Sequence, residues 1–261
     1  MISSVPLGRR CRHLLYVTQP LLSKPGTKEV MRSKPVGEPS PKQSASFAIT
    51  LKGTFNPLLH HPSWYYTVGQ LAKDEVAATV AVGGVEVTPA RSRFQAPAFR
   101  LDCTPGRWRV LTRDPAARLR LLQVATKTFE NLLPETRLEE VGFRFDFALE
   151  VPHRQVVDFL SRTMWNLMPA ESHGEVAATL ENTVSQDEAP RRKRLQLASG
   201  PGAERARLTV SFRYPLTQDK IFTLRQLSVA EDFELDYDEA LTYAEQLAYT
   251  LANAQATRLE N

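Results

Sequence analysis

The chain has 261 residues, of which 42% are hydrophobic and 24% are charged. This length and composition are typical of a globular protein with a substantial core, and they exclude a fully disordered chain. No apolar run approaches the roughly 18 residues that span a bilayer, so no transmembrane helix is expected. Two cysteines, Cys11 and Cys103, are too few for a disulfide framework or a cysteine-based zinc site, and we predict a reducing, cytoplasmic location.

The net charge of +4 is divided unevenly along the chain. Residues 1–44 carry eight basic and two acidic residues, whereas the rest of the chain carries 25 basic and 27 acidic ones. The basic character therefore belongs to the N-terminal segment. A high isoelectric point is then no argument by itself that the body binds nucleic acid.

Residues 1–44 contain six prolines and one aromatic residue, Tyr16. Such a segment buries too little apolar surface to offset the entropy of ordering it, so we predict that it is disordered. Three origins stay open: a genuine tail, an over-long start with the true initiator at Met31, or a targeting segment, which the early arginines would suit. Residues 45–261 are predicted to form one α+β domain.

The first part of this body alternates between strand and turn patterns. Residues 46–51 alternate like a half-buried strand, and Ser63 can cap a short helix that reaches residue 71. Residues 80–87, which include four valines, predict a strand broken at Gly83-Gly84. Residues 99–111 predict a hairpin that turns at Pro105-Gly106.

Two amphipathic helices and a long strand follow. Asp114 and Pro115 are typical of a helix start, and Pro134 ends the helix. Its apolar positions, at spacings of three and four, are Leu119, Leu122, Ala125, Phe129, Leu132 and Leu133. Residues 141–151 predict a strand with phenylalanines on one face and polar residues on the other. A second helix is expected from Pro152 to just before Pro169.

The last third predicts more strands and a final helix. Strands are expected over residues 176–184, 194–198 and 207–214, with one or two more within 222–235. The final helix is expected to begin at Asp236 or Asp238. Because strands follow one another with few helices between them, we predict an antiparallel sheet with amphipathic helices packed on one face. Both halves hold a strand meander followed by a long helix, which is compatible with a pseudo-duplicated unit.

Familiar catalytic and metal-binding patterns are missing from the sequence. It contains no nucleophile elbow, phosphate-binding loop, dinucleotide fingerprint or H-E-x-x-H motif. Neighbouring side chains diverge, so His60 and His61 are poor co-ligands for a metal. Asp146 and Glu150 would lie about 13 Å apart on a strand, too far for paired acid–base catalysis. We therefore expect no enzyme, no cofactor and no metal.

Arginines on the predicted strands are the feature with most functional content. They alternate with apolar residues, and this period of two places them on the sheet face opposite the core. Such a face could bind a polyanion such as nucleic acid, or an acidic protein partner. The alternatives are a plain solvated face, or neutralisation within the fold by acidic helices such as the final one, with Asp236, Asp238, Glu239 and Glu245. The candidate binding residues are Arg91, Arg93, Arg107, Arg109, Arg113, Arg192, Arg194, Arg205, Arg207 and Arg213.

Several short sequence motifs of the body resemble those of a known protein family. They are F-N-P at 55–57, H-P-S-W at 61–64, G-Q-L at 69–71, R-W-R-V-L-T-R-D at 107–114, T-F-E-N-L-L-P at 128–134 and V-G-F-R-F at 141–145. In these words residues 46–150 resemble a family of uncharacterised, sporadically distributed bacterial proteins. The words are structural, so the resemblance implies a fold and no reaction.

The sequence thus predicts a non-catalytic binding or assembly protein. We expect a subunit or accessory factor of a bacterial complex that acts through protein–protein contacts. Nucleic-acid binding through the arginine-rich sheet face is the alternative.

Overall fold

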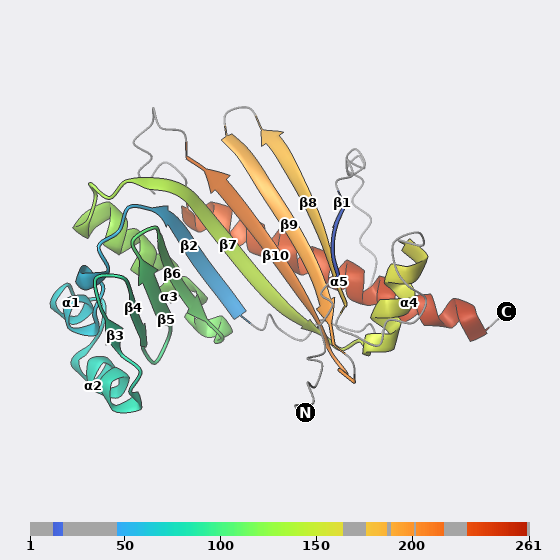
Figure 1. Cartoon of the computed structure of the whole chain (residues 1–261), viewed down its shortest axis with the longest axis horizontal. Coiled ribbons are helices and arrows are strands. Elements are labelled where there is room, and N and C mark those ends of the chain that lie inside the picture. Colours follow the sequence, from blue (N-terminus) through green and yellow to red (C-terminus); the bar gives the residue numbers. More distant parts are fainter. Residues whose placement is uncertain are drawn as a thin grey trace, which may run out of the picture.

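The computed structural model describes residues 13–17, 46–163, 176–186, 189–200, 202–216 and 229–259. Within these residues, ten strands form one sheet in the order β1-β8-β9-β10-β7-β2-β6-β5-β4-β3 (Figure 1). All neighbouring strands are antiparallel except β1 and β8. The predicted α+β class and antiparallel sheet are confirmed.

Two long strands lie side by side at the middle of the sheet. They are β2 (Ser46–Gly53) and β7 (Leu138–Leu149), and both were predicted from their alternating pattern. Their core-facing side chains meet directly, because Ile49 lies opposite Phe143 and Phe47 lies opposite Phe145. All of these side chains are buried, so the seam between β2 and β7 is also the centre of the hydrophobic core.

Meanders extend the sheet outward from both central strands. On the β2 side they are β6 (Arg107–Thr112), β5 (Arg100–Thr104), β4 (Ser92–Gln95) and β3 (Glu86–Val87). The turn between β5 and β6 contains Pro105 and Gly106, as predicted.

On the β7 side the meander is β10 (Ala206–Pro215), β9 (Ala189–Ser199) and β8 (Val176–Gln186). The two halves, β2 to β6 and β7 to β10, have the same topology. In each half the last strand along the chain pairs with the first, β6 with β2 and β10 with β7. Each half also ends in a long helix. The pseudo-duplication that the sequence allowed is present in the topology.

Among the described residues, helices cover one face of this sheet and none covers the other, which we call the open face (Figure 1). They are α3 (Arg118–Thr126), which η3 (Lys127–Leu132) extends, α4 (His153–Thr163) and α5 (Val229–Leu259). The predicted start of the first helix is confirmed as a 3-10 turn, η2 (Pro115–Ala117), whose cap residue Asp114 accepts a hydrogen bond from the Ala116 amide at 2.9 Å.

Leu119 was expected in the core but is 55% exposed. The buried stripe of α3 and η3 is centred on Leu121, Ala125 and Thr128. At about 100° per residue, Leu119 then points to the opposite side of the helix.

The segment between β2 and β4 forms helices at one end of the sheet. They are η1 (Pro57–Leu59), α1 (Pro62–Thr67) and α2 (Lys73–Val82). The cap of α1 is His61, whose Nδ1 accepts a hydrogen bond from the Trp64 amide at 3.1 Å, so the prediction that Ser63 caps it is wrong.

The strand predicted over residues 80–87 is wrong up to Val82, which is helical, and only Glu86–Val87 is a strand. The Glu75 carboxylate accepts the Ala72 amide at 2.7 Å at the helix start, and Gly83 has a positive φ of 76° at its end. These end contacts override the β propensity of the valines.

The final helix begins earlier than expected. Residues 229–235, predicted as a strand, are the first two turns of α5, whereas residues 222–228 lie outside the described part of the chain. Phe233 anchors this end of α5 in the core, with its ring 5.2 Å from that of Phe143 and 5.3 Å from that of Phe145. The predicted second helix is described as far as Thr163, and residues 164–168, which were also predicted to be helical, lie outside the described residues.

A short N-terminal strand joins the far edge of the sheet. β1 (His13–Val17) runs parallel to β8, with His13 opposite Val176 and Val17 opposite Leu180. The structure differs here from the predicted disorder, because the apolar run of β1 completes a sheet edge. The rest of residues 1–45 lies outside the described part.

Candidate functional site

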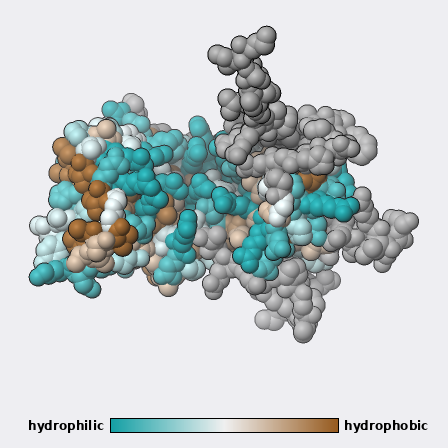
Figure 2. Space-filling model, turned by 60° about the horizontal axis from the view of Figure 1, so that its bottom comes forward, coloured by the Kyte–Doolittle hydropathy of each residue, from teal (hydrophilic) through white to brown (hydrophobic). Residues whose placement is uncertain are grey.

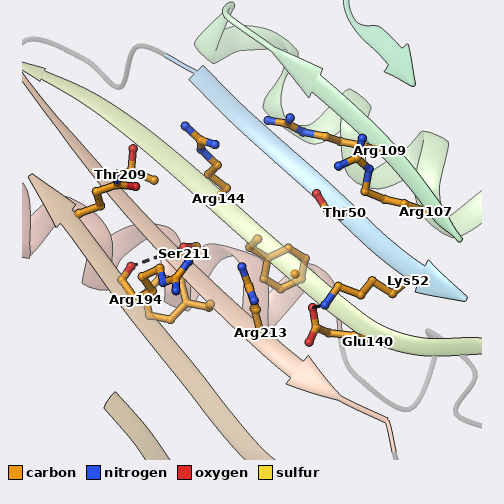
Figure 3. A pocket seen from close by; sticks show the side chains of 14 residues that line it. Thr50, Lys52, Arg107, Arg109, Glu140, Arg144, Arg194, Thr209, Ser211 and Arg213 are labelled. Carbon is orange, nitrogen blue, oxygen red and sulfur yellow. Dashed lines mark hydrogen bonds and ion pairs between the residues drawn. The ribbon is translucent and has the colours of Figure 1, made fainter. Parts of the chain in front are cut away.

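The open face of the sheet carries a shallow hollow of about 270 Å³ over β6, β2, β7, β10 and β9. Six lysine and arginine residues and one carboxylate line it, and they point toward it from both sides (Figure 3). We call this hollow the arginine trough. Its lining residues are Thr50, Lys52, Arg107, Arg109, Glu140, Gly142, Phe143, Arg144, Arg194, Gln196, Thr209, Ser211, Phe212 and Arg213.

The strand register explains why the trough is hollow. Arg109 lies opposite Thr50, Thr50 lies opposite Gly142, and Gly142 lies opposite Arg213. Two small residues thus separate two arginines that stand three strand spacings, about 14 Å, apart. A Cβ added to Gly142 would lie 3.5 Å from the nearest atom, the carbonyl oxygen of Phe212, which is an ordinary contact. The glycine is therefore not required by packing, and its effect is to keep the floor low.

Three of the cations in the trough have carboxylate partners. Lys52 Nζ lies 2.9 Å from Glu140, Arg194 lies 3.1 Å from Glu181, and Arg144 lies 2.8 Å from Asp146. These pairs hold the long side chains in place and neutralise part of the local charge.

Arg109 and Arg213 have no carboxylate within ion-pair distance among the described residues, and Arg107 reaches Asp102 only at 4.0 Å. The Nε of Arg109 is buried without a hydrogen-bond acceptor in the part of the chain that the structure describes. Burial lowers the pKa of Arg109, and the neighbouring guanidinium groups of Arg144 and Arg107 lower it further. Like charges held together in this way favour an anion that would pair with them.

Asp146 is the buried anion beside the trough. It accepts hydrogen bonds from Ser46 and Thr209, both at 2.6 Å, as well as from Arg144. Burial alone would raise its pKa, but these three donors outweigh burial and the pKa lies below its usual value. A carboxylate held charged by three donors is a poor proton carrier, and its role here is to orient Arg144.

Lys52, Arg144 and Gly142 also line the trough and were not among the residues predicted from the sequence. The alternating pattern of the strands could have identified two of them. Arg144 lies on the polar face of β7, and Lys52 lies two residues after Thr50, on the same face of β2. Gly142 has no side chain, so its contribution to the shape of the trough can be recognised only from the residues that lie beside it in the sheet.

Four of the ten candidate arginines line the trough: Arg107, Arg109, Arg194 and Arg213. The other six lie around it on the same sheet or beside it. Arg192 and Arg207 are exposed on β9 and β10, Arg93 lies on β4, and Arg113 follows β6. Arg91 pairs with Asp102, and Arg205 pairs with Glu150 at 3.2 Å.

The acidic final helix was expected to be a possible partner of these arginines, and its described contacts are with other cations. Asp236 and Glu239 of α5 pair with Arg191, and Glu239 also pairs with Lys193 at 2.8 Å. Arg191 and Lys193 alternate along β9 with Arg192 and Arg194, so they point to the helix-covered face. The pleat therefore separates the acidic helix from the trough.

His60, Cys103 and His153 lie in separate parts of the structure. His60 is buried, its Nδ1 lies 3.0 Å from the Tyr65 hydroxyl, and burial lowers its pKa to about 4. Cys103 is buried in the core, whereas His153 lies 3.1 Å from Ser199 near the start of α4. Among the described residues, no group of three or more potential ligands could hold a metal ion.

A second surface stands out at the end of the sheet that carries α1, α2 and β3. Thr79 is the buried residue of α2, whereas Val80 and Val82 are 62% and 75% exposed. Val85 and Val87 are exposed beside them, and apolar residues gather at this end of the molecule (left in Figure 2). A helix that buries a polar residue and exposes two of its three valines is unusual, and such patches typically mark interaction surfaces.

Neither a protein-family model nor a curated protein matches the chain. In the described part of the chain, every helix is too short or too polar to cross a membrane.

Proposed function

We propose that this chain is a non-catalytic binding protein that takes a multiply charged anionic partner in the arginine trough. The observation that carries the proposal is the row Arg109–Thr50–Gly142–Arg213. Two cations without carboxylate partners among the described residues flank a floor that packing would allow to be filled. Guanidinium groups bind oxyanions through paired hydrogen bonds, which suits phosphates and carboxylates alike.

The test fills the floor of the trough without changing any charge. Gly142→Leu adds a side chain to the hollow, and Ala148→Leu adds the same side chain to the same face of β7 outside it. Binding of heparin, polyphosphate, polyglutamate and duplex DNA is measured for both variants and the wild type. We expect at least one polyanion to bind, and Gly142→Leu to weaken that binding about tenfold, a loss of about 1.4 kcal/mol.

Ala148→Leu should bind like the wild type. Equal loss in both variants, or no binding of any of the four polyanions, would contradict the proposal.

Assembly through protein–protein contacts is a second candidate function, and the exposed valines of α2 favour it. The partner we propose for that surface is a second copy of this chain. Residues 76–85 carry no charge, so two copies of the surface can meet without repulsion. β3 is an edge strand, and antiparallel pairing of two such edges would bury both patches and keep both open faces on one side.

Sedimentation velocity of the wild type and of Val82→Lys tests this second candidate. We expect the wild type to form a dimer that Val82→Lys dissociates. Leu119→Lys, at an exposed leucine of α3, is the matched control and should remain dimeric. A monomeric wild type at high concentration would contradict dimer formation at this surface.

A further inference from the structure

We infer that the partner bound in the trough is a double-stranded nucleic acid, and that the protein contacts the phosphates of both its strands. This inference rests on the proposed function and narrows it. An acidic protein surface would suit the same charges, so the choice depends on the symmetry, the composition and the extent of the cationic face.

Symmetry is the first argument. The two halves of the sheet share one topology and meet along β2 and β7, where Thr50 is paired with Gly142. A pseudo-two-fold axis through this pair exchanges β2 with β7 and β6 with β10. Arg109, opposite Thr50, then corresponds to Arg213, opposite Gly142.

The same axis relates two further cations of the trough. Lys52 lies two residues beyond Thr50, and Arg144 lies two residues beyond Gly142 on the antiparallel strand. Four cations thus form two symmetric pairs, Arg109 with Arg213 and Lys52 with Arg144, around a neutral centre (Figure 3). A duplex has two antiparallel phosphate chains related by two-fold axes, and proteins with two-fold symmetry use this match. A single acidic peptide has no such symmetry.

Composition is the second argument. The open-face positions of β2, β6, β7, β9 and β10 in the described residues carry arginine, lysine, threonine, serine, glycine, alanine, leucine, glutamine, proline and carboxylates, and no aromatic residue. Phe143 and Phe212 border the trough but are buried toward the core. Single-stranded nucleic acids bind mainly by stacking their bases on aromatic side chains. A duplex keeps its bases stacked inside and presents phosphates, which match this face.

Extent is the third argument. The central row continues past the trough to Arg93 on β4 at one side, with Asp102 of β5 between Arg93 and Arg109, and to Arg192 on β9 at the other. These two strands lie six strand spacings, about 29 Å, apart. A row of this length, with four arginines against the one carboxylate of Asp102, exceeds what a small anion needs and suits a polymer. Contacts of this kind are made to phosphates, so the binding should be independent of sequence.

The test uses the full chain, because β1 belongs to the sheet and a truncated chain would lose it. Fluorescence anisotropy follows the binding of 20-base-pair DNA and RNA duplexes of two unrelated sequences over a range of salt concentrations. Arg109→Gln with Arg213→Gln removes the symmetric pair. Arg154→Gln with Lys73→Gln removes two exposed cations on α4 and α2 and is the charge-matched control.

We expect the trough variant to bind both sequences about tenfold more weakly, with a log–log salt slope shallower by about two, because two phosphate contacts are lost. The control should remain within about twofold of the wild type, since long-range charge effects are screened by salt. A midpoint of thermal unfolding at or above that of the wild type would show that the trough variant is folded.

Two further ligands, single-stranded DNA and polyglutamate, separate this inference from the proposed function. If polyglutamate binds in the trough and duplexes do not, the partner is an acidic protein and the inference is overturned while the proposed function stands. Tighter binding of the single strand than of the duplex also overturns the inference. If the trough variant and the control lose affinity equally, the trough is not the binding site, and both the proposed function and this inference are contradicted.

Discussion

Arg109 shows at the scale of one residue how binding and stability oppose each other. Its Nε is buried without an acceptor among the described residues, and two like charges, Arg107 and Arg144, lie nearby. A buried donor without a partner costs about 1–3 kcal/mol. The folded protein holds the Arg109 guanidinium pre-organised for a ligand, because water has already been removed from this group when the protein folds.

Replacing Arg109 by methionine should therefore stabilise the protein. Methionine retains the length of the aliphatic stem and removes the charge, so we expect the free energy of unfolding to rise by about 1 kcal/mol. Urea denaturation at low ionic strength measures this change, which should shrink in high salt as repulsion is screened. Arg154→Met, on the exposed surface of α4, should be neutral. Destabilisation by Arg109→Met would show that this guanidinium is satisfied in the folded state.

Asp236 should make stability depend on pH. It is 1% exposed, accepts hydrogen bonds from the Tyr214 hydroxyl at 2.8 and 2.9 Å, and contacts Arg191. Burial raises its pKa to about 7, although Arg191 and Tyr214 favour the charged form and Glu239, on the same helix, opposes it. The folded protein then holds a proton on Asp236 between about pH 4 and pH 7 that the unfolded chain has released.

Stability should consequently fall as the pH rises through this window, by up to about 1.4 kcal/mol per pH unit, and level off above pH 7. Chemical denaturation at pH 5, 6, 7 and 8 measures the slope for the wild type and for Asp236→Asn. The variant keeps the shape of the side chain without its titration, so the difference between the two proteins isolates this group. Parallel profiles for the two proteins would refute the assignment.

At the scale of elements, α5 is the helix that completes the core. Its first two turns insert Phe233 between the rings of Phe143 and Phe145, while Leu235 on the same turn is 66% exposed. One turn of this helix thus provides both a buried and an exposed large apolar side chain. This contrast makes the placement of residues 229–235 testable.

We expect Phe233→Ala to lower the free energy of unfolding by about 3–5 kcal/mol, because it leaves a cavity against the sheet. Leu235→Ala should change it by less than about 0.5 kcal/mol, since the side chain is mostly solvated. Urea denaturation measures both variants. Similar costs for the two substitutions would indicate that this segment is not packed as a helix on the sheet.

At the scale of the whole molecule, the two halves share the seam between β2 and β7 and one continuous core. The two halves cannot separate without breaking the buried pairing of β2 with β7, so we expect the body to unfold in one transition. In a Trp165→Phe variant, Trp64 and Trp108 report on the first half by fluorescence, whereas circular dichroism reports on both halves. The two signals should change at the same urea concentration. Two separated transitions would show that the duplicated halves are independent domains.

The trough lies on this seam, so it exists only where both halves meet. β6 and β10 carry its two arginines without carboxylate partners among the described residues, and roughly one hundred positions of sequence separate them. Both halves of the sheet therefore contribute residues to the trough, as they do to the core beneath it.

The local pattern of the sequence determined the α+β class, most strand positions, the cap at Asp114 and the face to which each arginine points. These features depend on neighbours two to four residues apart, through the pleat of a strand or the turn of a helix. Local propensity failed at residues 80–82 and 229–235, where helix-end contacts and the packing of Phe233 outweigh it.

Only the tertiary structure decided which arginines meet. The pairing of Thr50 with Gly142 sets the low floor, and it also brings Arg109 and Arg213 to its two sides. Likewise, the docking of α5 on the covered face assigns its carboxylates to Arg191 and Lys193 and leaves the trough positive. Strand order and register arise from hydrogen bonds and core contacts between distant segments, and a single sequence does not encode such partners in any local pattern.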